Sequence, residues 1–426
     1  MLRMTGAPAA STTLAGLDVL LDQTSGERLA ATVTMLAGTT FTGRRVGSPG
    51  GTAAGTWLAD LLATTGATVA RDTFTVGRVP QVYAPPAVSW QRGHQVVRLE
   101  FGRDVAVHLA SADRAHALRA PLGAAGYGDP AGRWLLVPPG MGLFDAYGHA
   151  DGAAGLLLAR GVDADGWHYT MLAGPDPGPV PVLSIETGLH QRMTDAVRRA
   201  DHDTTLTAAT PIRRSKVTGT NLYARYRTVA AGGLDLLLTA HYDGVGDHPG
   251  LRQPAAADNG SGVAVVCEAA RLLAGTLPDG IGLQVALLDA EETGALGSAH
   301  HARRLTDGGE RPAVINVDGA GHLNTAAAVE AGGPAHRLLA VLDRAARHTG
   351  LPLVAGPVAS DNRRYAAAGL AAVGIGAGMA GYHSPADTPD RVQTATMVAL
   401  CRLIVATAWL AAVAKASLSS LIGDRR

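Results

Sequence analysis

The chain has 426 residues, which exceeds the usual size of a single hydrophobic core, so one large domain with a smaller second one is expected. Hydrophobic residues make up 47% of the chain and charged residues 17%, and the 36 Lys and Arg residues balance 36 Asp and Glu residues. A formal net charge of zero provides no electrostatic attraction for nucleic acid or an anionic membrane, so we expect neither as a partner.

The N-terminal residues 1–21 lack an uninterrupted apolar segment behind a basic start, so no signal peptide is recognised and a cytoplasmic location is expected. The most apolar stretch, residues 403–414, is too short to span a bilayer and is expected to be a buried C-terminal helix. Cys267 and Cys401 both lie in apolar, helix-like runs, which predicts buried thiols rather than a disulfide framework.

The first 79 residues alternate helix and strand signals, with helical spacing of apolar residues over 17–38 and 52–66. From about residue 80 the pattern changes to short alternating runs punctuated by Pro and Gly, which is typical of short strands. We therefore expect a smaller β-rich domain over residues 80–212. It would be inserted between an N-terminal part of the main domain, 1–79, and its larger part, 213–426.

After residue 212, strand-like and helix-like runs alternate regularly. The strand-like runs are 221–227, 234–240, 283–289, 313–318 and 371–376, and the helix-like runs are 261–275, 296–308, 334–350 and the C-terminal stretch. Alternation of this kind predicts an α/β fold, with a mostly parallel, mixed sheet sandwiched by helices.

Histidines and carboxylates follow the ends of these strands, where ligands bind in such sheets. They are His241, Asp243, Glu291, Glu292, Asp318 and His383, and Asp258 and Asn259 stand just ahead of a helix. Two neutral imidazoles and three of these carboxylates, on one edge of a sheet, would form a mixed nitrogen and oxygen ligand set that suits zinc or a similar divalent ion.

Five protein ligands exceed the requirement of one tetrahedral zinc. They suit two ions about 3.5–4 Å apart, with one bridging carboxylate and a water between them. One further carboxylate should remain free to take a proton from that water. Because the side chains of Glu291 and Glu292 point in different directions, one of them can hold metal while its neighbour faces the water.

Other catalytic motifs fit less well. NGSG (259–262) lacks the spacing of a serine hydrolase elbow. GAGMAG (376–381) has glycines at dinucleotide-binding spacing but leads into Tyr-His-Ser-Pro rather than into a helix.

Several motifs, in chain order, resemble the co-catalytic dizinc aminopeptidases of metallopeptidase family twenty-eight. They are HYD (241–243), DNGSG (258–262), EETGALGS (291–298), VD (317–318) and YHSPADTPD (382–390). GRRVGSPGG (43–51) is similar to the N-terminal segment of that family, and residues 80–212 resemble its protease-associated insert.

The resemblance implies two Zn²⁺ ions, with Co²⁺ or Mn²⁺ as substitutes. The implied metal ligands are His241 and Asp318 on one ion, Glu292 and His383 on the other, and Asp258 as the bridge.

The resemblance also implies the roles of the neighbouring residues. Glu291 matches the general base, and Asp243 matches a carboxylate that orients His241. Tyr382 matches a hydrogen-bond donor to the developing oxyanion, and the bond between Asp258 and Asn259 matches a cis peptide.

The expected reaction is hydrolysis of the N-terminal residue of a peptide, and the expected substrates are peptides or small amides. A carboxypeptidase-type enzyme or an amidohydrolase of the same family is an alternative. It would need cations for a substrate carboxylate, and Arg252, Arg363 and Arg364 are the candidates. A glutaminyl-cyclase-like reaction would use one zinc, and a receptor-like binding protein would be expected to have lost ligands.

Overall fold

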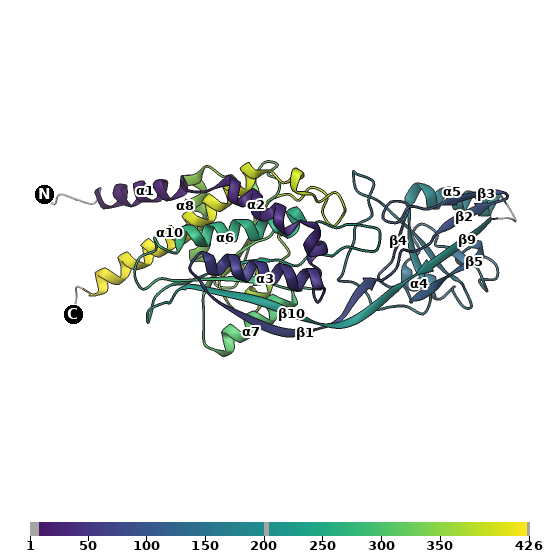
Figure 1. Ribbon diagram of the computed structural model, residues 1–426, viewed down its shortest axis with the longest axis horizontal. Helices are drawn as coiled ribbons and strands as arrows, with labels where there is room; N and C mark the ends of the chain where they lie inside the picture. The colour runs from purple at the N-terminus through teal and green to yellow at the C-terminus, as the bar shows by residue number, and fades with distance from the viewer. Residues whose placement is uncertain (1–7, 200–203, 424–426) are drawn as a thin grey trace.

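The computed structural model describes residues 8–199 and 204–423. Figure 1 shows a helix-covered body and a β-rich body, connected by two long strands, β1 (Thr68–Val82) and β10 (Ile212–Arg227). These strands pair antiparallel along their length, from Thr68 opposite Arg225 to Val82 opposite Ile212. The strand predicted at 221–227 is therefore the end of a much longer element.

The helix-covered body is built on an eight-stranded mixed sheet in the order β1-β10-β12-β11-β13-β16-β14-β15. Its other strands are β11 (Asp235–His241), β12 (Gly282–Leu288), β13 (Ala313–Val317), β14 (Ala327–Gly332), β15 (Leu353–Ala355) and β16 (Ala372–Gly376). The four central strands β12, β11, β13 and β16 are parallel. The predicted α/β fold with a mixed sheet is confirmed.

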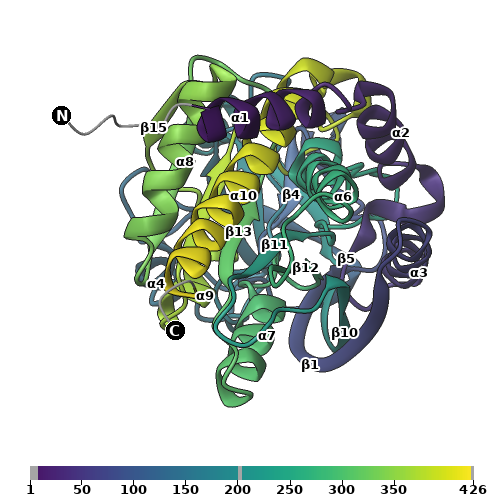
Figure 2. The same ribbon diagram turned by 90° about the vertical axis from the view of Figure 1, so that its left-hand side faces the viewer.

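Helices cover both faces of this sheet (Figure 2). One face carries α2 (Gly26–Leu36), α3 (Pro49–Thr64), α6 (Gly262–Leu273), α8 (His336–Thr349) and α10 (Thr394–Gly423), with α1 (Pro8–Leu21) packed on α10. The other face carries α7 (Leu296–Asp307) and α9 (Asn362–Ala367). Because both faces are covered, every residue of β12 is buried, which explains why all of its residues except Gln284 are apolar or Gly.

The β-rich body contains a second eight-stranded sheet in the order β3-β2-β9-β5-β6-β7-β8-β4. Its strands are β2 (Ser89–Arg92), β3 (Gln95–Arg98), β4 (Val105–Val107), β5 (Arg114–Ala124), β6 (Trp134–Leu136), β7 (Gly155–Arg160), β8 (Val182–Glu186) and β9 (Thr204–Thr210). Two helices accompany it, α4 (Leu143–Tyr147) and α5 (Thr187–Arg198). The insert boundaries at 80 and 212 and the likeness to a protease-associated domain stay predictions.

Two expected helices differ from the prediction. The region 17–38 divides into α1 and α2, and the side chain of Ser25 caps α2 by accepting a hydrogen bond from the Arg28 amide. The C-terminal helix is longer than the expected stretch. Its residues Thr394–Ala416 form a helix long and apolar enough to cross a membrane by length and composition, although 61% of an apolar 18-residue window within it is buried inside the protein. The burial expected for 403–414 holds at Leu403, which is fully buried in the main core.

Short helical turns complete the chain. They are η1 (Thr39–Arg44), the π-helical turn η2 (Ala256–Ser261) and η3 (Pro389–Arg391). Cys267 and Cys401 are both buried free thiols, as predicted.

Candidate metal centre

The predicted ligands converge because the central strands are parallel neighbours and end at one edge of the sheet. His241 is the last residue of β11, and Asp318 directly follows β13. Glu292 follows β12, and Asp258 lies in η2, just before α6. His383 reaches the site from the loop after β16. In that loop Gly381 adopts a φ of +74°, and an added Cβ would lie 2.3 Å from the Ala386 carbonyl carbon.

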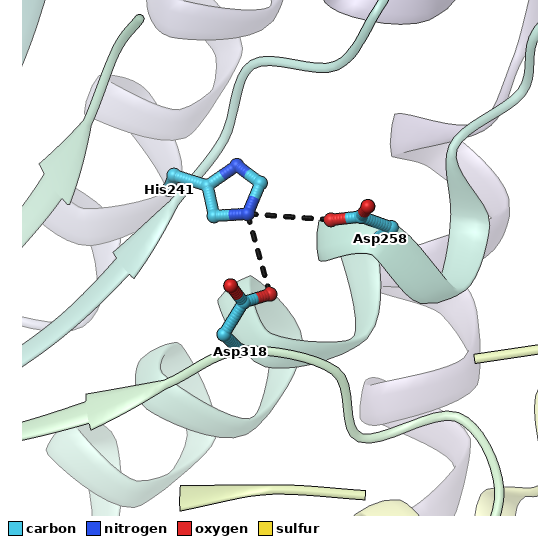
Figure 3. Close-up of side chains that lie close together, drawn as sticks. All are labelled: His241, Asp258 and Asp318. Atoms are coloured by element: carbon cyan, nitrogen blue, oxygen red, sulfur yellow. Dashed lines mark hydrogen bonds and ion pairs between the residues drawn. The ribbon is translucent and has the colours of Figure 1, made fainter. Parts of the chain in front are cut away.

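Asp258 connects two groups of potential ligands. The Nε2 atom of His241 lies 3.3 Å from Oδ1 of Asp258 and 3.3 Å from Oδ1 of Asp318 (Figure 3). The Nε2 atom of His383 lies 3.0 Å from Oδ2 of Asp258 and 2.9 Å from Oε2 of Glu292. Within each group the ligand atoms all lie within 4.8 Å of one another, and all five residues are buried.

The electrostatics of this buried cluster favour a bound cation. Although burial acts to lower it, the pKa of His241 is raised well above its usual value by Asp318 and other carboxylates. Burial raises the pKa of Glu292, and the buried Oε1 atom of Glu292 has no hydrogen-bond partner. A divalent cation would neutralise the carboxylates and use this orphaned oxygen. Each group offers one imidazole nitrogen and two carboxylates, so the residues fit zinc.

Asp243 supports both sides of the centre. Its carboxylate lies 3.5 Å from Nδ1 of His241, on the ring edge opposite the potential metal. The same carboxylate accepts hydrogen bonds from the backbone amides of Glu291 at 3.0 Å and Glu292 at 3.2 Å. One buried side chain therefore orients an imidazole and holds the turn that carries both glutamates.

Asn259 fixes the opposite side of the centre. Its amide group donates to the Val317 carbonyl at 2.9 Å, and its Oδ1 accepts from the amides of Gly262 and Gly319, each at 3.0 Å. These bonds tie the start of α6 to the end of β13, next to Asp318. The Asp258–Asn259 peptide is cis.

The two predicted catalytic residues lie at the edge of the ligand cluster. Burial, opposed by His241 and reinforced by Asp318, raises the pKa of Glu291 well above its usual value. A carboxylate with a raised pKa is a stronger base than an exposed one, which suits a proton acceptor. The ring of Tyr382 stacks on His383 with 3.8 Å between centroids, and the side chain remains 40% exposed.

Three supporting residues were not predicted individually. The buried guanidinium of Arg44 donates to four backbone carbonyls, those of Leu36, Tyr242, Pro254 and Ala255. Asp387 accepts from the amides of Ala257 at 2.6 Å and Asp258 at 3.0 Å. Both residues lie in motifs that carry the family resemblance, which was the available signal.

The third residue, Met171, comes from the β-rich body. Its sulfur lies 3.3 Å from Nδ1 of His383, on the ring edge opposite the potential metal, and the Thr170 amide donates to the His383 carbonyl at 2.9 Å. No local sequence signal marks Met171, since a lone methionine carries no ligand pattern. The β-rich body therefore contributes directly to the surroundings of the centre.

The three arginines considered for a substrate carboxylate are engaged elsewhere. Arg252 donates to the Ala37 carbonyl, and Arg364 donates to the Gly294 carbonyl at 2.6 Å. Arg363 forms an ion pair with Glu330 at 2.7 Å.

Comparisons with known proteins agree with this geometry. Residues 221–408, which contain all five potential ligands, match Peptidase family M28. No curated protein matches the chain.

Solved structures share the fold. A zinc aminopeptidase from Bacillus subtilis is 19% identical, with 91% of this chain and 95% of that chain covered and a TM-score of 0.69. An aminopeptidase from Aneurinibacillus sp. strain AM-1 is 19% identical over 91% of this chain and 94% of that one, with a TM-score of 0.68. A glutaminyl cyclase from Fimbriiglobus ruber is 16% identical over 91% and 96%, with a TM-score of 0.52. At these identities the likeness establishes the fold, and the family assignment rests on the sequence match. Residues 221–408, the part of the chain that holds the candidate metal centre, are therefore similar in sequence to Peptidase family M28.

Proposed function

We propose that the chain is an aminopeptidase that holds two zinc ions and removes N-terminal residues from peptides. The observation that carries the proposal is the pair of buried ligand groups that share Asp258, with Glu291 directly beside the ligand Glu292. The aminopeptidases of similar fold support the same reaction.

The residues of the chain divide the work. When bound, the zinc ions would lower the pKa of a water toward about 7 and polarise the substrate carbonyl. Glu291 accepts the proton of the attacking water on its carboxylate and returns it to the leaving amine. Asp243 keeps Glu291 in place through the backbone hydrogen bond at 3.0 Å. The partly exposed Tyr382 hydroxyl donates a hydrogen bond to the carbonyl oxygen as that atom gains charge.

Two features favour a free amino terminus on the substrate. Glu291 is not in either ligand group, so with both ions bound it leaves a carboxylate beside the centre that suits an ammonium group. The arginines Arg252, Arg363 and Arg364, which a carboxypeptidase-type reaction would use, have other partners. The complete set of five ligands favours two ions over the single zinc of a glutaminyl-cyclase-like reaction.

The test combines metal analysis with a base variant. We expect the wild type to hold two zinc ions per chain and to cleave aminoacyl anilides but not their N-acetylated forms. Glu291→Gln should lower kcat by about a hundredfold or more while the zinc content is unchanged. The exposed Glu27, changed to Gln, is the matched control and should behave as wild type.

Three results would contradict the proposal. A content of one zinc per chain would contradict the dinuclear site. Cleavage of only the N-acetylated substrates would contradict the aminopeptidase activity. Full activity of Glu291→Gln would contradict the role of Glu291 as the general base.

A further inference from the structure

A cavity outside the metal centre lies between the β-rich body and the helix-covered main body. Its volume is about 330 Å³, and its walls come from both bodies. They include the end of β1 at Pro80–Val82, the segment 168–175 between β7 and β8, and His248 and Leu251 of the main body. None of the described residues that line the cavity is Asp or Glu.

One guanidinium and three imidazoles line this cavity. Arg160 is half-buried, and within residues 8–199 and 204–423 its guanidinium has no hydrogen bond or ion pair. His168 is 2% exposed, and neither of its ring nitrogens has a hydrogen-bond partner. Nδ1 of His248 is also buried without a partner. Nδ1 of His108 accepts from the Ala110 amide, so the proton of its neutral ring is on Nε2.

The charge of Arg160 affects the neighbouring rings. Burial and the nearby Arg160 lower the pKa of His168 and of His108. For His168, the backbone of Asp104 and Gly161 and the carboxylate of Glu186, which lies outside the cavity lining, offset part of this lowering. The histidines are therefore neutral at pH 7, and each can donate one N–H. Arg160 supplies the positive charge.

This group of residues does not form another metal site. Among the described residues, only the two groups that share Asp258 bring three potential ligand atoms within 4.8 Å of one another. An unpaired guanidinium beside unsatisfied, neutral imidazoles, with no carboxylate among the described lining residues, instead suits an anion.

The cavity shares a wall with the metal centre. Thr170 and Met171 line the cavity, and the same residues contact His383 through the Thr170 amide and the Met171 sulfur. Gln253, beside the centre, donates to the Thr170 hydroxyl at 2.8 Å. A ligand in the cavity therefore lies beside the segment that contacts His383.

The other lining residues and the cavity volume indicate the polarity and size of the ligand. Apolar side chains such as Val82, Phe101, Leu172 and Leu251 make up much of the lining. A volume at the lower end of the roughly 300–1,000 Å³ typical of ligand sites holds one or two amino-acid residues.

We propose that this cavity binds a carboxylate of the peptide substrate, with Arg160 as the specificity-determining residue and His168 as an additional donor. The proposal rests on the proposed aminopeptidase function. It makes the enzyme selective for peptides that carry a carboxylate close to the scissile bond, either at the C-terminus of a short peptide or on an acidic side chain.

The test uses matched peptides. A short peptide is assayed as the free acid and as the amide, and the amide is assayed with Glu or Gln as its last residue. A hydrogen bond to a charged group implies that the wild type prefers the carboxylate form in at least one pair by about 10- to 100-fold in kcat/KM. Arg160→Gln should bring that ratio close to one. The exposed Arg119, changed to Gln, should leave the ratio at the wild-type value.

Binding without turnover separates this proposal from the proposed function. Calorimetry with the N-acetylated free acid and its amide should show the same preference, and Arg160→Gln or His168→Gln should reduce it. If only N-acetylated acids are cleaved and cleavage depends on Arg160, the aminopeptidase assignment fails and the carboxylate site stands. The carboxylate site is overturned if the wild type shows equal kcat/KM and equal affinity for the acid and amide forms. It is also overturned if Arg160→Gln keeps the wild-type preference for the acid.

Discussion

Changing Asp243 to Asn tests whether one buried carboxylate organises the metal centre. The side chain of Asp243 is fully buried, and its two oxygens accept the amides of Glu291 at 3.0 Å and Glu292 at 3.2 Å. It also faces Nδ1 of His241 at 3.5 Å. Asn keeps the shape but offers one acceptor oxygen, so its NH₂ group would face one of the two backbone amides.

The expected losses of stability and of zinc affinity follow from these contacts. One buried donor left unsatisfied costs about 1–3 kcal/mol, and the remaining hydrogen bond loses about 1 kcal/mol when its acceptor is no longer charged. Loss of a partner that orients a ligand typically lowers metal affinity about 10- to 100-fold. In the metal-free protein the loss is partly offset, because Asp243 repels neighbouring acids. Burial and Asp243 together raise the pKa of Asp289 to about 8.

Zinc affinity of Asp243→Asn, measured by chelator competition, should therefore fall about 10- to 100-fold. Thermal unfolding should show a larger loss of stability with zinc than with chelator. The exposed Asp60, changed to Asn, serves as the control and should match the wild type in both assays. Zinc affinity within twofold of the wild type, or equal losses of stability in both conditions, would refute the role assigned to Asp243.

Met171→Leu removes the sulfur beside His383 but keeps the side-chain volume, so zinc affinity should fall about tenfold. Met171→Gln offers an amide oxygen in place of the sulfur and should recover most of that affinity. Equal zinc affinities of the wild type and Met171→Leu in chelator competition would contradict this role of Met171. Although burial acts to raise it, Arg271 and Arg28 lower the pKa of Glu268 to about 2, below the usual 4.5. Its stabilising effect is present above about pH 4.5 and is lost as the pH falls toward 2. In thermal unfolding of the chelated protein, Glu268→Gln should be less stable than wild type at pH 7, and this gap should close near pH 2; a gap that persists there would be inconsistent. Leu403→Ala in α10 should lower the free energy of unfolding by about 2–5 kcal/mol in urea titrations, because Leu403 is fully buried. A change below 0.5 kcal/mol, on the order of an exposed site, would argue against the packing of α10.

The sequence determined much of the main fold because the relevant signals are local. Strand-like runs such as 283–289 and helix-like runs such as 296–308 alternate, and parallel strands place the residues that follow them at one edge. His241, which ends one such strand, and Asp318, which follows another, were therefore predicted to meet, and they do. The same local signals predicted too short a strand for β10, because its first half is mostly polar and small residues that give no clear strand pattern.

Only the tertiary structure decided which distant residues support the centre. Asp387 holds the Asp258 amide from 129 positions along the chain, and Met171 contacts His383 across 212 positions. Arg160 and His248 likewise meet at one cavity from separate bodies. No local periodicity specifies such pairs, and the pairs that involve Met171 or Arg160 depend on how the two sheets pack. The sequence thus determined which residue types follow each strand, and the packing of the β-rich body against the main sheet determined their surroundings.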